Sequence, residues 1–281
     1  MGLFLQVSQA AADVLRGAYE QAMRERREVV DVGVLKEAAA VVRGVLLEGV
    51  SSAAAGVGDA PELREARWAV RRSATFLPGD PVWSAGVVEV LPEVVRRVRG
   101  EPYTPLLPAL GPLGVLQGRS AVGRWASGVL GRMLLRSRRA GGPVLAALEM
   151  EASRQAVLLG RPVDTAAVVL AVLSLDEQLT AGGQQLRERY RAANEGGAVL
   201  RARGVTLAGA QAGAPAVRAE QGPADRRLTW GHTPADPDWT EAAARVWDAA
   251  LELAAGRDAG TSHLVQALGR VDAPAAAELL G

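Results

Sequence analysis

Residues 239–269 constrain the fold more than any other stretch of this chain. Residues 239–254 form a pattern in which apolar side chains recur every three or four positions, which predicts an amphipathic helix. Residues 255–260, rich in Gly and Asp, predict a short turn. Thr261 then stands where the N-cap of a second helix is expected, ahead of apolar residues at the same spacing. The stretch therefore predicts a helical hairpin.

The composition agrees with helices packed through small side chains. Aromatic residues make up only 4% of the chain and Ala is abundant, which favours helices over a β-sandwich. The 281 residues have room for one large or two modest domains. Lys36 is the only lysine, a preference for arginine that is typical of a GC-rich genome such as an actinobacterial one. The net charge of +1 gives no argument for nucleic acid or an anionic membrane as a partner.

The hairpin pattern recurs along the chain, and the last hairpin is its fourth copy. A first copy spans residues 7–47, with Asp31 as the cap of its second helix. A degenerate second copy has Ser84 as its cap. A third copy has a first helix over residues 143–159 and a second helix that begins near Thr165. Three of the copies carry alanines four positions apart in their first helix: Ala18 and Ala22, Ala152 and Ala156, Ala250 and Ala254.

The segments outside the hairpins are expected to connect them. Residues 101–118 are rich in Pro and Gly and predict a linker, followed by a connector helix over residues 119–136. Residues 177–194 predict a charged, solvated helix, and the low-complexity residues 208–226 predict a mobile linker. Glu149 and Glu151 have the pattern of ordinary solvated charges on a helix.

The fourth copy resembles one half of the N-terminal domain of the Clp (Hsp100) unfoldases. In that family Phe-Thr opens a first helix and Gly-Thr-Glu-His-Leu-Leu opens a second one. Trp239-Thr240 and Gly260-Thr261-Ser262-His263-Leu264 stand at those places here. The stretch Val163-Asp164-Thr165, with the apolar residues after it, matches the second motif, and residues 197–207 resemble the end of a half domain. The resemblance covers residues 137–281 well and 7–100 weakly.

This resemblance implies an all-α fold of helical-hairpin repeats of the Clp N-terminal type, arranged as two pseudo-symmetric pairs. The expected organisation has degenerate repeats in residues 1–100 and a linker with a connector helix in 101–140. A Clp N-like domain is expected in 141–281, interrupted by a mobile linker at about 208–236.

Clp N-terminal domains bind substrates, adaptors and peptide-like small molecules and do no chemistry. The resemblance implies a non-catalytic protein- or peptide-binding module that acts as an adaptor, a competitor or a sequestering protein in Clp-dependent proteolysis. Its partners would be protein or peptide segments, including Clp protease components or peptide-like small molecules, without a cofactor or metal. The residues carried over as ligand-binding are Trp239, Thr240, Thr261, His263 and Thr165, with a core anchor as the alternative role of Trp239.

One recognition function of the family is not expected here. In some relatives an acidic residue after the cap Thr holds a phosphorylated arginine. The corresponding positions are Gly33, Ala85, Ala166 and Ser262, none of which carries the carboxylate needed to pair with a guanidinium.

Two other classes of function stay open: a helical scaffold for self-association into a homo-oligomer, and a hydrolase that uses His263. The position of His263, two residues after the expected cap Thr261 of an apolar helix, favours packing or helix-end hydrogen bonding over catalysis. The other histidine, His232, is expected in a solvated loop. The chain has no cysteine for a zinc site and no phosphate-binding loop for an ATPase.

The longest apolar run, residues 166–175, is too short to span a bilayer, and the first residues lack the features of a signal peptide. The chain is therefore expected to be cytoplasmic, without a membrane or a nucleic acid as partner.

Overall fold

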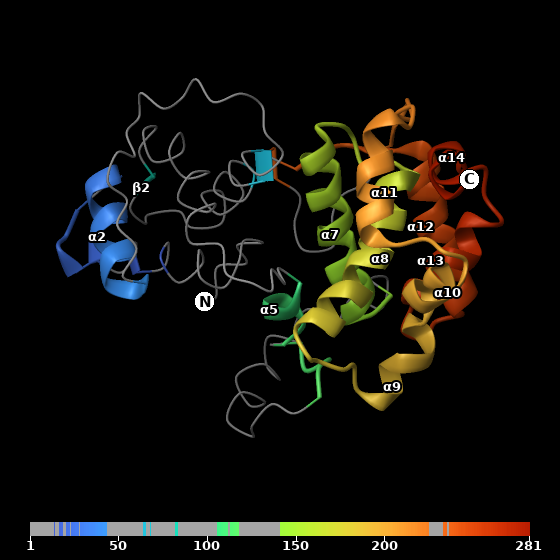
Figure 1. The fold of residues 1–281 in the computed structure, drawn as a ribbon, viewed down its shortest axis with the longest axis horizontal. Coiled ribbons are helices and arrows are strands. Elements are labelled where there is room, and N and C mark those ends of the chain that lie inside the picture. The colour runs from blue at the N-terminus through green and yellow to red at the C-terminus, as the bar shows by residue number, and fades with distance from the viewer. Residues whose placement is uncertain are drawn as a thin grey trace. The chain divides into compact units, whose positions relative to one another are not determined.

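The computed structural model divides into two compact units (Figure 1). The first unit holds residues 1–105 and 233–236, and the second holds residues 106–232 and 237–281. The description covers residues 14, 17, 18, 21, 22, 24–27, 29–43, 64, 65, 68, 82–83, 106–111, 113–117, 141–224, 233–234 and 236–281. These residues are mostly helical.

The described elements of the first unit are β1 (Val29–Val30), α2 (Val32–Arg43) and β2 (Val82–Trp83). β1 and β2 form a short parallel pairing in which Val30 lies opposite Trp83. Between β1 and α2, the Asp31 carboxylate accepts a hydrogen bond from the Val34 amide at 3.0 Å. This bond satisfies a free N–H group of the first helical turn, so the predicted cap is confirmed.

Residues 233–236 belong to the first unit through Trp68. The indole of Trp68 is buried and donates a hydrogen bond to Oδ1 of Asp236 at 3.0 Å. The other oxygen of Asp236 accepts hydrogen bonds from the amide and the hydroxyl of Thr233, at 2.8 and 3.1 Å. The buried carboxylate is thus well supplied with donors.

The second unit is built from short and long helices with two short strands. Its elements are α5 (Leu107–Leu110), α7 (Pro143–Leu159), α8 (Thr165–Ala181), α9 (Glu188–Arg191), η3 (Ala192–Asn194), α10 (Gly196–Ala202), α11 (Leu207–Gly213), η4 (Ala214–Ala216), β3 (Pro223–Ala224), β4 (Trp239–Thr240), α12 (Glu241–Ala254), α13 (Thr261–Leu268) and α14 (Pro274–Leu280).

α7 and α8 form the predicted third hairpin. α7 begins at Pro143, whose ring suits the first helical position. It ends at Leu159, and the capping residue Gly160 has a left-handed conformation (φ 68°). The amide of Gly160 returns to the carbonyls of Ala156 and Val157, so the turn closes on the helix itself. Asp164 then caps α8 by accepting a hydrogen bond from the Ala167 amide at 2.9 Å. The bounds predicted for α7 are confirmed.

α8 is the central helix of the second unit. Its first eleven residues, 165–175, are all buried, which fits their almost unbroken apolar sequence. α7 packs on one side of α8, and α12 and α13 contact it on the other (Figure 1). The apolar run over residues 166–175, which is too short to span a bilayer, therefore belongs to a helix that other helices cover. Among the helices that the structure describes, none has the length and apolar character needed to cross a membrane.

The prediction of solvated charges on α7 is wrong. Glu149 and Glu151 are both 0% exposed. The Glu151 carboxylate accepts hydrogen bonds from the Arg154 guanidinium at 2.5 and 2.8 Å, from Gln155 at 2.8 Å and from Ser174 of α8 at 2.7 Å. A charge can be buried when it is paired and hydrogen-bonded in this way.

The predicted solvated helix over residues 177–194 is also wrong. α8 continues to Ala181 and stops where Gly182 and Gly183 follow, Gly183 with φ 59°. Leu186 then forms an antiparallel bridge with Leu116, and only after it do α9 and η3 begin. The paired glycines end a helix that the charge pattern alone would continue.

Much of the predicted mobile linker is ordered secondary structure. Residues 207–216 form α11 and η4, and the Thr206 hydroxyl caps α11 at the Gly209 amide, 3.1 Å away. β3 pairs antiparallel with β4. Val217 packs between α8 and α14 against Ala166 and Ala275. Residues 225–232 of the expected linker, with the loop around His232, lie outside the described residues, as do the connector helix over 119–136 and the cap at Ser84.

Candidate functional site

Glu220 lies where the N-terminal ends of three helices meet. Its carboxylate accepts hydrogen bonds from the hydroxyl and the amide of Thr165, the amide at 3.2 Å. It also accepts from the Thr240 hydroxyl at 2.9 Å and the Ala275 amide at 3.1 Å. Thr165 begins α8, Thr240 caps α12 and Ala275 lies in the first turn of α14. N–H groups there have no partner within their own helix, and the helix dipoles favour a negative charge.

Arg161 fixes the segment that carries Glu220. Its Nη1 donates hydrogen bonds to the carbonyls of Ala214 and Val217, at 3.2 and 2.9 Å. Its Nε lies 3.0 Å from Oδ2 of Asp164, an ion pair without the alignment of a hydrogen bond. Burial raises the pKa of Asp164, against the opposing effects of a backbone hydrogen bond and the Arg161 charge. Residues 214–220 are thus attached at both ends.

Thr261 has a similar structural role at the start of α13. The N-cap of α13 is Gly260 and not Thr261, which is the first helical residue. The Thr261 hydroxyl accepts a hydrogen bond from the Gly196 amide at 3.0 Å, and its amide donates to the Asn194 side chain at 3.0 Å. A Cβ atom on Gly196 would lie 2.3 Å from the Thr261 carbonyl oxygen, so the close approach of α10 and α13 requires glycine there.

His263 holds the first turn of α13 together. Its Nδ1 accepts a hydrogen bond from the Gly260 amide at 3.2 Å, so a neutral ring carries its proton on Nε2. Burial lowers the pKa of His263, and the positive charge of Arg257 lowers it further. The predicted helix-end hydrogen bond is confirmed.

Trp239 is part of the core of the second unit. Its side chain is 1% exposed, and its ring meets that of Trp247 edge to face with centroids 5.1 Å apart. The Trp239 backbone forms a parallel bridge with Val163, the residue that leads into α8. This is the core-anchor alternative that the sequence left open.

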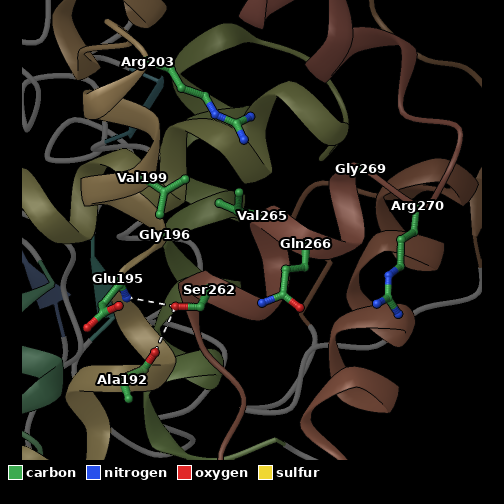
Figure 2. Close-up of a pocket in the computed structure, with 10 residues that line it drawn as sticks. All are labelled: Ala192, Glu195, Gly196, Val199, Arg203, Ser262, Val265, Gln266, Gly269 and Arg270. Atoms are coloured by element: carbon green, nitrogen blue, oxygen red, sulfur yellow. Dashed lines mark hydrogen bonds between the residues drawn. The ribbon is translucent and has the colours of Figure 1, made fainter.

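An open groove of about 520 Å³ lies between α10 and α13 (Figure 2). At one end Ser262 joins the two sides, because its hydroxyl donates to the Ala192 carbonyl at 3.1 Å and accepts from the Glu195 amide at 3.0 Å. The groove is lined by Ala192, Glu195, Gly196, Val199, Arg203, Ser262, Val265, Gln266, Gly269 and Arg270.

Apolar side chains line the middle of the groove, and one arginine follows each of the two helices. Val199 is 41% exposed, although burial of a valine side chain is favourable in free energy. Val265, from α13, also lines the groove (Figure 2). Arg203 follows the last residue of α10, and Arg270 lies just beyond α13. This arrangement suits a ligand with both an aliphatic and a polar part.

The residues predicted to bind a ligand do not line this groove. Thr165, Thr240, Thr261 and Trp239 are each at most 1% exposed, and His263 is half-buried. Four of them are thus enclosed by the chain itself. A role of these five residues in ligand binding stays a prediction.

The sequence interpretation missed Glu220 and the arginines of the groove. Glu220 stands in a stretch of Ala, Gly, Gln and Pro, where no local pattern marks a partner. Arg203 and Arg270 follow helices that are far apart in the sequence, and they line one groove only in the folded unit. Within the described part of the chain, no group of three or more His, Cys, Asp or Glu side chains could hold a metal ion.

No protein-family model, curated protein or solved structure matches this chain.

Proposed function

We propose that this protein is a non-catalytic protein- or peptide-binding module of the Clp N-terminal type, which acts as an adaptor, competitor or sequestering protein in Clp-dependent proteolysis. The observation that carries the proposal is the groove between α10 and α13. It is open, it has an exposed valine at its centre, and it is flanked by polar groups that could orient a bound chain (Figure 2).

A likeness between the two units supports the repeat architecture in this proposal. In the second unit, Val163 pairs in parallel with Trp239 just before α8 begins. In the first unit, Val30 pairs in parallel with Trp83 just before α2 begins. Each valine is followed by an aspartate that caps the helix. This likeness aligns Trp83 with Trp239 and supports the proposal that the first unit is a second pair of hairpins.

Crossed hydrogen bonds support a pseudo-symmetric pair within the second unit. The Thr165 hydroxyl, at the start of α8, accepts from the Ala276 amide of α14 at 2.9 Å. The Thr261 hydroxyl, at the start of α13, accepts from the Gly196 amide of α10 at 3.0 Å. In each hairpin, the threonine that begins the second helix therefore accepts a hydrogen bond from the N-terminal part of a helix that follows the other hairpin. This exchange is expected for two related halves.

The neighbouring Ser262 and His263 favour a binding role over the hydrolase alternative. The Ser262 hydroxyl bonds to the backbone on both sides of the groove, and Nδ1 of His263 accepts the Gly260 amide. A nucleophile and its base need a hydrogen bond to each other, and these two side chains are engaged elsewhere.

A peptide-display selection with the full chain tests the proposal. We expect enrichment of peptides with an aliphatic residue, bound with micromolar affinity or better, and recovery of a Clp unfoldase, protease subunit or Clp substrate in a pull-down. Val199→Asp should abolish peptide binding, because it places a charge in the apolar centre of the groove.

Val41→Asp is the matched control, since Val41 is an exposed valine of α2 (85% exposed) in the first unit. The proposal fails if no peptide is enriched and no Clp component is recovered. It also fails if Val199→Asp binds as the wild type does. A stable oligomer in light scattering whose interface covers the groove would support the self-association scaffold instead.

A further inference from the structure

Two arginines of the α10–α13 groove have no partner for their charge. Within the described residues, neither Arg203 nor Arg270 has a side-chain hydrogen bond or ion pair, and both are exposed. By contrast, Arg201 of α10, two positions before Arg203, pairs with Asp176 at 2.9 Å. The groove thus presents two free guanidinium groups beside its apolar centre (Figure 2).

We propose that the groove takes an acidic peptide segment, in which an aliphatic residue is flanked by carboxylates. This inference rests on the proposed function and names the class of its ligand. The aliphatic side chain covers Val199 and Val265, which removes apolar surface from water. Carboxylates of the segment pair with Arg203 and Arg270, because the planar guanidinium fork matches a carboxylate in shape and charge.

Glu195 determines how an acidic segment is oriented in the groove. It lies at the end where Ser262 joins the two sides of the groove, whereas Arg203 and Arg270 follow the C-terminal ends of α10 and α13 (Figure 2). A carboxylate of the ligand is repelled near Glu195 and attracted by Arg203 and by Arg270. The carboxylates that flank the aliphatic residue therefore lie toward Arg203 and Arg270, and a neutral or basic residue binds beside Glu195.

The test uses the full chain and a library of labelled dodecapeptides with a central Leu-Val pair. One set carries Asp and Glu beside this pair, and the matched set carries Asn and Gln at the same positions. We expect the acidic set to bind about tenfold more tightly at low salt, as two exposed ion pairs allow, with a preference that shrinks as salt is added.

The double variant R203Q/R270Q should lose this preference and keep its affinity for the amide set. Arg245→Gln is the control, because it removes an exposed arginine of α12 outside the groove and should keep the preference. Circular dichroism and thermal unfolding show whether each variant is folded.

The inference is overturned if the wild type binds both sets equally, or if the double variant keeps the preference for acidic peptides. In both results the peptide binding itself survives, so the proposed function stands. If neither set binds, the proposed function falls and the inference falls with it.

Discussion

The Glu220 carboxylate accepts a hydrogen bond from the Thr240 hydroxyl at 2.9 Å, and Thr240 in turn accepts one from the Ala243 amide at 3.2 Å. One threonine thus caps α12 and binds a carboxylate from a segment twenty positions earlier. Because Thr165 and Ala275 donate to the same carboxylate, a single side chain links α8, α12 and α14. Thr165 and Thr240, which the sequence predicted to bind a ligand, are consequently part of the fold's internal hydrogen bonding.

Glu220→Gln should destabilise the second unit. All the groups that Glu220 contacts are donors, and an amide places its own N–H groups against some of them while removing the charge. Leaving one or two donors unpaired costs roughly 1–3 kcal/mol, measured as a lower unfolding midpoint. Glu252→Gln on the exposed side of α12 is the control and should leave the midpoint unchanged. Equal midpoints for the two variants would contradict this role of Glu220.

Glu151→Ala should be far more harmful than the removal of a surface ion pair. It removes a buried carboxylate that accepts hydrogen bonds from Arg154, Gln155 and Ser174, which is expected to cost roughly 3–5 kcal/mol. Glu188→Ala breaks a pair of the same spacing, with Arg191 at 2.8 Å, on the exposed face of α9. That loss should stay below about 1 kcal/mol. Chemical unfolding of both variants measures the difference, and comparable losses would show that burial of Glu151 does not matter.

Gly196→Ala should disturb the junction of α10 and α13. The new Cβ would lie 2.3 Å from the Thr261 carbonyl oxygen, which is backbone and cannot rotate away. We expect a loss of about 2 kcal/mol or more and weaker peptide binding. Gly269→Ala lines the same groove, but its Cβ would meet nothing nearer than 3.6 Å, so stability should stay within about 0.5 kcal/mol of the wild type. Thermal unfolding that ranks the two variants the other way would refute the close approach.

His263 should make the stability depend on pH. Its pKa is lowered in the folded state from the ordinary value of 6.5, so the folded protein binds fewer protons than the unfolded chain. The stability it contributes is therefore present above pH 6.5 and is lost as the pH falls through the folded pKa, when protonated Nδ1 can no longer accept the Gly260 amide. NMR titration of the ring protons should give a pKa below 6.5.

His263→Gln provides the matched variant for this prediction. Glutamine at the third helical position can accept the same amide through its carbonyl oxygen and does not titrate. The variant should match the wild type at about pH 7.5 and lose less stability on going to about pH 5.5. An identical pH dependence in both proteins would assign it to another group.

The described helices follow the sequence where local signals are strong. The bounds of α7, the turn before α13, the cap at Asp31 and the last helix were all predictable, because Pro, Gly and Asp mark these places by their own backbone preferences. The linker was mispredicted for a tertiary reason. Its Ala- and Gly-rich residues have little local preference, and they are ordered by Arg161 and Glu220 across long sequence separations.

In the candidate site, too, some features follow from local sequence signals and others only from tertiary contacts. The sequence by itself determined that this chain forms helical hairpins with threonine at their junctions, because helical periodicity and capping are local properties. Only the tertiary structure decided that those threonines turn inward and that a groove opens between α10 and α13 instead. Which face of a helix stays exposed depends on the helices that pack against it. Val199, Arg203 and Arg270 come to share one groove only when residues far apart in the chain are brought together.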